Sequence, residues 1–245
     1  MSGAPARVTL NIDLGELPDE PEALYTLATQ VNVACGGHAG DVASMMKACR
    51  LARAHHVAVA AHPSYPDRAG FGRTTLAIAP AELRASLATQ CRTLREAAHG
   101  EGTAVHLVKA HGALYHDVAV DDAAAEALVA AVHETLDTEG EIAFVGPPEG
   151  ALARAVARHA QRRWGPILAE GFADRAYDGE GAAAKLRPRG QPGALLTDPA
   201  AAAAQALSLA RTGRYGTICV HGDTPGALAI AQAVRAALEG EGLLR

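Results

Sequence analysis

Short apolar runs alternate along this chain with longer segments in which apolar residues recur at helical spacing. The runs predict seven strands, at residues 8–12, 31–34, 57–61, 105–108, 142–145, 167–169 and 217–220. Helices are predicted after Asp41, where Val42, Met45, Met46 and Cys49 share one face, and at about 80–98, 122–136, 147–162, 200–211 and 225–240. Residues 171–199 are expected to be irregular. Strands that alternate with helices are typical of a parallel α/β fold.

A closed barrel fits this pattern better than a doubly wound sheet. The seven strand–helix units are similar to one another, and no dinucleotide-binding or P-loop glycine motif follows an early strand. The chain has 245 residues and shows no repeat or linker, and α/β barrels of this length are commonly single domains. We therefore expect one α/β barrel domain over residues 1–245.

Ionisable residues follow nearly every predicted strand. They are Asp13 and Glu16 after the first, His38 and Asp41 after the second, His62 after the third, Lys109 and His111 after the fourth, Glu170, Asp174 and Arg175 after the sixth, and His221 and Asp223 after the seventh. In a parallel barrel the carboxyl ends of all strands meet at one face, which carries the active site. We therefore expect Asp13, His38, His62, Lys109, His111 and Asp174 to line a single pocket.

Some of these residues also have an ordinary structural interpretation. Asp41 and Asp223 each precede a predicted helix, so both are expected to be helix caps. Six further histidines lie in or beside helices and are expected to be structural or on the surface: His55, His56, His99, His116, His133 and His159. What favours an active site is the joint pattern, because so many ionisable side chains at strand ends are unusual in a structural protein.

Charge and composition narrow the functional classes. The net charge is −5 and basic residues form no long run, so neither a nucleic-acid partner nor an anionic membrane surface is expected. The four cysteines are far apart, which predicts neither a disulfide framework nor a zinc knuckle. No signal peptide and no membrane-spanning apolar stretch is evident, so we expect a cytoplasmic protein.

Several segments resemble the signatures of a known family, in the same order and over nearly the whole chain. They are residues 11–16 (NIDLGE), 32–41 (NVACGGHAGD), 61–68 (AHPSYPDR), 70–73 (GFGR), 109–115 (KAHGALY), 170–177 (EGFADRAY) and 220–223 (VHGD). The chain is thereby identified as similar to the LamB/YcsF family. Two positions depart from the family pattern, which usually has Cys in place of Ile12 and Pro in place of Ala110.

The resemblance implies an irregular seven-stranded parallel (β/α) barrel, similar to the glycoside hydrolase and deacetylase group. It implies ATP-dependent cleavage of 5-oxo-L-proline to L-glutamate, carried out together with two partner subunits, B and C. No phosphate-binding glycine loop is visible in this chain, so ATP is expected to be used mainly by the partner subunits.

Opening a lactam requires a base for water and groups that stabilise negative charge. Asp13 is expected to be the general base or a metal ligand, with Glu16 close by, and His38, His62 and His111 are expected to relay protons or bind a divalent ion. The metal set considered is Asp13, His38 and His62. Lys109 suits the phosphorylated oxygen or the substrate carboxylate. Substrate binding is assigned to Arg73, Asp174, Arg175 and His221.

Two other functions remain open at this point. The first is a stand-alone metal-dependent deacetylase or sugar-amide hydrolase on the same barrel, which stoichiometric zinc and ATP-independent activity on acetylated sugars would favour. The second is a non-catalytic scaffold protein within a larger complex, which the complete set of pocket residues argues against.

Overall fold

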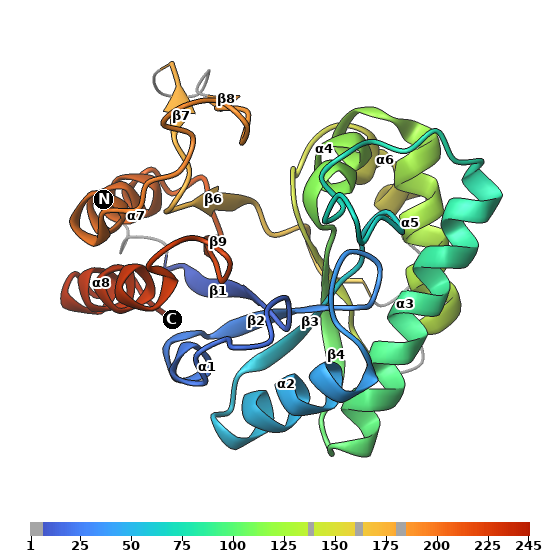
Figure 1. The fold of residues 1–245 in the computed structure, drawn as a ribbon. Helices are drawn as coiled ribbons and strands as arrows, with labels where there is room; N and C mark the ends of the chain where they lie inside the picture. The colour runs from blue at the N-terminus through green and yellow to red at the C-terminus, as the bar shows by residue number, and fades with distance from the viewer. Residues whose placement is uncertain (1–6, 137–139, 160–163, 180–184) are drawn as a thin grey trace.

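Seven parallel strands form the centre of the computed structural model, which describes residues 7–136, 140–159, 164–179 and 185–245. Their spatial order is β5-β4-β3-β2-β1-β9-β6, so strands close in sequence are neighbours except at β1 and β9. Figure 1 shows the strands surrounded by helices, with a small separate hairpin projecting beyond α7. The predicted α/β barrel architecture is confirmed.

The strands of the barrel are β1 (Thr9–Leu14), β2 (Gln30–Ala34), β3 (Ala58–His62), β4 (Val105–Lys109), β5 (Ala143–Val145), β6 (Glu170–Phe172) and β9 (Thr217–His221). The hairpin consists of β7 (Tyr177–Asp178) and β8 (Lys185–Leu186). The helices are α1 (Ala23–Leu27), α2 (Val42–Ala54), α3 (Pro80–Gly100), α4 (Gly112–Val120), α5 (Asp122–Thr135), α6 (Ala151–Arg158), α7 (Pro199–Arg211) and α8 (Ala227–Gly240).

The local sequence explains where several of these helices begin. Asp41 accepts a hydrogen bond from the Ser44 amide, and the Ser44 hydroxyl accepts one from the Asp41 amide, so α2 starts with a reciprocal capping box. Asp121 caps α5 and Asp198 caps α7 in the same direction. The prediction that Asp41 is a cap is confirmed.

The barrel is closed by one continuous stretch of chain. Residues of this stretch bond to β5 first, through an amide hydrogen bond from Leu168 to Phe144 and one from Gly146 to Leu168. The next residues form β6, which pairs with β9. A single segment therefore spans the gap between the two edges of the sheet. This explains why the predicted strand at 167–169 is displaced: Leu168 makes only an isolated bridge, and the strand itself is Glu170–Phe172.

The helices form an outer layer around the strands. α3 packs against both α2 and α5, and α7 packs against α8 (Figure 1). β1 and β2 are buried almost throughout, as expected of parallel strands covered on both sides. Among the described residues, no helix is long and apolar enough to cross a membrane.

Four other expectations differ from the structure. Helices α1 and α4 were not predicted; both are short, and neither has a side-chain cap at its start. The stretch expected to be irregular contains β6 and the β7–β8 hairpin. The helix expected from residue 147 begins at Ala151, and its expected end at 162 lies outside the described residues. Asp223 is not a cap: α8 begins after Gly226, and Asp223 binds arginines instead.

Candidate active site

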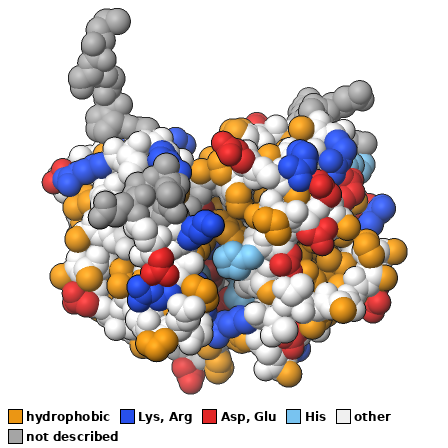
Figure 2. All heavy atoms as spheres, turned by 90° about the horizontal axis from the view of Figure 1, so that it is seen from above, with side chains coloured by type: hydrophobic (Ala, Val, Ile, Leu, Met, Phe, Trp, Pro, Cys, Tyr) orange, Lys and Arg blue, Asp and Glu red, His pale blue; other side chains and the backbone are white. Residues whose placement is uncertain are grey.

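A cavity of about 460 Å³ opens at the carboxyl ends of the barrel strands. Figure 2 shows this face hollowed along its middle, with histidine side chains in the hollow and Lys or Arg side chains beside it. The ionisable side chains that line the cavity are Asp13, His62, Arg73, Lys109, His111, His116, Asp117, Arg175, Arg187, Arg189 and His221. Phe172 and Tyr115 add aromatic surface to its wall.

Lys109 lies at the centre of one buried group, which we call the lysine group (Asp13, Lys109, Glu170 and Cys219). Its Nζ is 2.8 Å from Asp13 Oδ1, 2.9 Å from Glu170 Oε1 and 3.0 Å from Cys219 Sγ. Burial alone would lower the pKa of Lys109, but the Asp13 carboxylate outweighs it and raises that pKa well above its usual range. Lys109 is therefore a permanently charged ammonium held by two carboxyl groups.

Asp13 is a stabilised carboxylate in this setting. Besides contacting Lys109, Asp13 Oδ1 accepts a hydrogen bond of 2.7 Å from the side-chain amide of Asn32. Asp13 Oδ2 is 3.4 Å from His62 Nε2. Burial would raise the pKa of Asp13, but the Lys109 ammonium outweighs it and holds the pKa well below its usual value. Such a carboxylate takes up a proton poorly, which weakens the case for Asp13 as the general base.

Asp174 and His221 form a second arrangement at the same strand ends. Asp174 Oδ1 is 2.9 Å from His221 Nδ1, while its Oδ2 accepts hydrogen bonds from the His221 amide and the Thr224 hydroxyl. A carboxylate accepts only, so Nδ1 of His221 carries the proton and Nε2 offers a lone pair. Burial would lower the pKa of His221, but Asp174 outweighs it and raises that pKa above its ordinary value.

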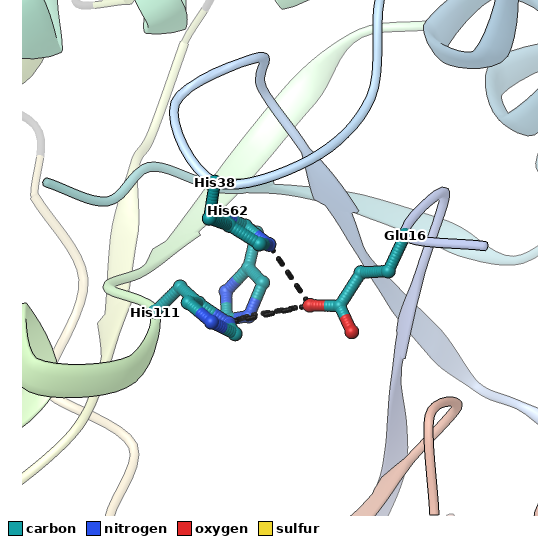
Figure 3. Close-up of side chains that lie close together, drawn as sticks. All are labelled: Glu16, His38, His62 and His111. Carbon is teal, nitrogen blue, oxygen red and sulfur yellow. Dashed lines mark hydrogen bonds and ion pairs between the residues drawn. The ribbon is translucent and has the colours of Figure 1, made fainter. Parts of the chain in front are cut away.

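Glu16 and three imidazoles form the other buried group, which we call the histidine group (Glu16, His38, His62 and His111). Figure 3 shows the three rings on one side of the carboxylate, with dashed lines converging on one oxygen. Glu16 Oε1 is 2.9 Å from His38 Nε2, 3.2 Å from His111 Nδ1 and 3.8 Å from His62 Nε2. The His38 and His111 rings are stacked, with centroids 3.6 Å apart. Burial lowers the pKa of His38 to about 4 and also lowers the pKa of His111.

Arginines surround the mouth of the cavity. Arg73 and Arg189 both pair with Asp223, Arg189 at 2.8 Å. Arg175 is buried, donates a hydrogen bond of 2.9 Å to the Arg187 carbonyl, and has an Nε atom without a hydrogen-bond partner among the described residues. A cavity rimmed in this way favours anionic ligands such as carboxylates and phosphates.

The structure brings all of the predicted site residues to one end of the barrel, but not all of them to the cavity surface. Asp13, His62, Lys109 and His111 line the cavity, together with Arg73, Arg175 and His221. Glu16, His38 and Asp174 are buried behind it and touch it only through other side chains: Glu16 and His38 through His111, and Asp174 through His221. The expectation of one pocket lined by six residues therefore holds for four of them.

Other residues of the site were not selected from the sequence. Glu170 was noted at a strand end but given no role, and Cys219 was passed over because it lies within an apolar strand. Arg187 and Arg189 lie in the stretch expected to be irregular, and His116, expected to be structural, lies at the cavity edge. For Cys219, the alternation of side chains between the two faces of β9 was the one available signal. Cys219 and His221 are two residues apart, so their side chains point to the same side of the strand.

Among the described residues, two sets of side chains have donor atoms close enough to share one cation, with the atoms of each set within 4.8 Å of one another. They are Glu16, His38, His62 and His111, and, separately, Asp13, Cys219 and His221. The set considered from the sequence, Asp13 with His38 and His62, is divided between the two. The Asp13 set already has a cation, because the Lys109 ammonium contacts both Asp13 and Cys219.

Known proteins similar to this chain share its full extent. Residues 8–244 match the LamB/YcsF family. A protein from Streptomyces avermitilis, named as the A subunit of 5-oxoprolinase, is 41% identical, with 96% of this chain and 97% of that protein covered. The protein of the same name from Chloroflexus aggregans is 42% identical, with 96% of each covered. The crystal structure of the lactam utilization protein from Thermus thermophilus superposes with a TM-score of 0.82 at 36% identity, covering 96% of this chain and 97% of that one. This chain belongs to the LamB/YcsF family.

Proposed function

We propose that this chain is the A subunit of an ATP-dependent 5-oxoprolinase and carries out the opening of the lactam ring of 5-oxo-L-proline to give L-glutamate. The names of the relatives, 5-oxoprolinase and lactam utilization protein, support the substrate. The observation that carries the proposal is the cavity itself, whose wall includes the oriented His221 imidazole, the buried Lys109 ammonium and four arginines.

His221 is the general base in this proposal, in place of Asp13. Its ring is held by Asp174, so its Nε2 lone pair faces the cavity. His221 Nε2 and Asp13 Oδ2 are 3.8 Å apart, too far for a direct hydrogen bond, which leaves the attacking water a position within reach of both. An imidazole is a suitable base near neutral pH, whereas the stabilised Asp13 carboxylate serves to hold Lys109.

Charge stabilisation is assigned to Lys109 and the arginines. The Lys109 ammonium lies in the cavity wall and is positioned to stabilise negative charge that develops on the oxygen of the lactam carbon. Arg175, whose Nε lacks a partner among the described residues, suits the substrate carboxylate, and Arg73 lines the same cavity. Glu16, His38, His62 and His111 complete the proposed catalytic group next to Asp13.

Coupling to ATP makes the reaction favourable, because a lactam is resonance-stabilised and glutamate recloses. Phosphorylation of the lactam oxygen makes the ring carbon a good electrophile. One water then adds to that carbon with loss of a proton to His221, and the carbon–nitrogen bond breaks as the nitrogen takes up a proton, giving γ-glutamyl phosphate. A second water releases inorganic phosphate and glutamate. We assign the phosphorylation to partner subunits B and C, since no phosphate-binding glycine loop is evident in this chain.

Reconstitution tests this proposal. Glutamate formation from 5-oxo-L-proline and ATP is measured with this chain alone, with subunits B and C alone, and with all three together. We expect product only from the complete mixture, and we expect His221→Gln in this chain to abolish it while the complex still assembles. Full activity from the isolated chain would refute the division of labour. Equal activity from B and C without this chain would refute its catalytic role.

A further inference from the structure

The two buried groups of the site differ in one respect that the proposed reaction does not explain. In the lysine group, each carboxyl group faces a cation. In the histidine group, three imidazole nitrogens and one carboxylate oxygen face one another, and no lysine or arginine contacts them in the described part of the chain.

The tautomers of two of these rings are fixed by backbone carbonyls. His62 Nδ1 lies 2.8 Å from the Lys109 carbonyl oxygen, and His111 Nε2 lies 3.0 Å from the Phe71 carbonyl oxygen. A carbonyl only accepts, so both of these nitrogens carry hydrogen. In the neutral rings, His62 Nε2 and His111 Nδ1 are therefore lone pairs, and they face each other at 3.0 Å.

Two lone pairs at this distance repel each other unless a positive charge lies between them. Burial opposes an imidazolium here, because a charged ring loses its hydration. Metal-binding histidines typically direct one ring nitrogen at the ion and donate a hydrogen bond from the other to an acceptor. His62 and His111 have this arrangement, since each donates one ring N–H to a backbone carbonyl.

Four of the contacts among the donor atoms have spacings near those of a tetrahedral metal centre. With zinc–nitrogen bonds of 2.0–2.1 Å, two ligand atoms of a tetrahedron are about 3.3 Å apart. The contacts within the group are 2.9 Å for His38–Glu16, 3.0 Å for His62–His111, 3.2 Å for His111–Glu16 and 3.8 Å for His62–Glu16. Three imidazoles and one carboxylate are ligands that suit zinc and neighbouring divalent transition metals.

The surrounding loop holds the group tightly. Phe71, which supplies the carbonyl to His111, has a positive φ of 55°, and Gly72 follows with a φ of 64°. A Cβ atom at position 72 would lie 2.9 Å from His38 Cβ and 3.1 Å from His111 Cδ2. A residue with positive φ and a glycine therefore lie directly against the rings, at a position where a side chain would collide with His38, and strained backbone of this kind is common at ligand sites.

We propose that Glu16, His38, His62 and His111 bind one divalent transition-metal ion, of which zinc is the best match. His62 and His111 line the cavity, so the ion lies in its wall, beside Asp13. The proposal does not depend on the reaction assigned to the chain.

Cobalt binding tests the site without any activity measurement. The full chain is stripped with a chelator and titrated with Co²⁺, and the visible absorption is recorded. We expect saturation at one equivalent with the intense bands of a tetrahedral nitrogen and oxygen site, displacement of cobalt by zinc, and a rise in melting temperature with bound metal. His38→Ala and the shape-preserving Glu16→Gln should each weaken binding at least about tenfold.

His106→Ala is the matched control, because His106 is exposed on the same strand as Lys109. It should bind cobalt like the wild type, and circular dichroism should show that every variant is folded. Absence of saturable cobalt binding overturns the proposal. So does equal weakening in the His106 variant, and so does a thiolate-to-cobalt charge-transfer band, which would place the ion at Cys219 instead.

Discussion

The lysine group and the histidine group lie side by side at the same strand ends, yet the negative charge of their buried carboxylates is compensated in different ways. Both bury carboxylates, with Asp13 in one and Glu16 in the other. Asp13 is neutralised by an ammonium that the chain itself provides. Glu16 is surrounded by imidazole rings, and the lone pairs of His62 and His111 face each other beside it. The lysine group contains its own cation and needs no added ion, whereas the converging donor atoms of the histidine group suit a bound metal ion.

Removing the internal cation should produce the largest effect. Lys109→Met leaves Asp13 and Glu170 buried without a counter-charge, which should destabilise the chain by about 3–5 kcal/mol. Urea denaturation measures the change. Lys47→Met is the control, since Lys47 pairs with Glu22 on the surface, where such a pair contributes about 0–1 kcal/mol. Equal losses in the two variants would show that the lysine group is not special.

Replacing the proposed base should affect activity more than stability. We expect His221→Gln to lower kcat of the reconstituted complex by about 10²-fold or more, the usual contribution of general base catalysis. His55→Gln, on the surface, is the control. A decrease in kcat of only a few-fold would show that another residue is the general base. Asp13→Asn would then be the variant to test.

The helix cap beside the histidine group should have a smaller effect. Asp41→Ala removes the capping box at the start of α2, directly after the loop that carries His38, and should cost about 1 kcal/mol of stability. Thermal or urea denaturation measures this, with the exposed Asp19→Ala as the control. If the loop depends on the cap, cobalt affinity falls as well, while the lysine group is unaffected. Unchanged stability would show that other contacts fix this helix start.

The pH dependence of stability should show the smallest effect, because it concerns one ring. The folded-state pKa of His221 is raised above its ordinary value of 6.5, mainly because Asp174 outweighs the opposing effect of burial. Its contribution is therefore complete below the unfolded pKa and is lost as pH rises through the folded one. The free energy of unfolding of the wild type should therefore decrease as pH rises from the unfolded to the folded pKa of His221. His221→Gln should abolish this decrease. A decline that persists in the variant would assign it to another group.

The sequence predicted the strand ends well because a buried parallel strand has a direct local signature. Asp13, His62 and Lys109 were found for that reason: each ends an apolar run, and the barrel brings such ends together. Cys219 could not be selected in this way, because it lies inside an apolar run, and only its two-residue spacing from His221 indicated that it faces the site. Arg189 could not be placed either, since its position depends on its ion pair with Asp223, 34 residues further along the chain.

The roles within the site depended on partners that a sequence does not show. Asp13 was expected to be the general base or a metal ligand, and which role a carboxylate takes depends on the groups beside it, here Lys109 at 2.8 Å. In the same way, Asp223 precedes a helix as a cap would, and the arginines across the cavity mouth decide its role.

The pairing of β1 with β9 has a consequence for the order in which the site forms during synthesis. The histidine group comes entirely from residues 16–111, so its parts leave the ribosome within the first half of the chain. The lysine group and the proposed base, His221, cannot form until β9 has been synthesised. Asp13 pairs in register with His221, and the side-chain amide of Asn11 donates a hydrogen bond to the hydroxyl of Thr217, 206 residues away. Contacts between such distant residues form slowly. In a growing chain, all four residues of the histidine group are therefore synthesised well before Asp13 can meet the strand that completes the lysine group.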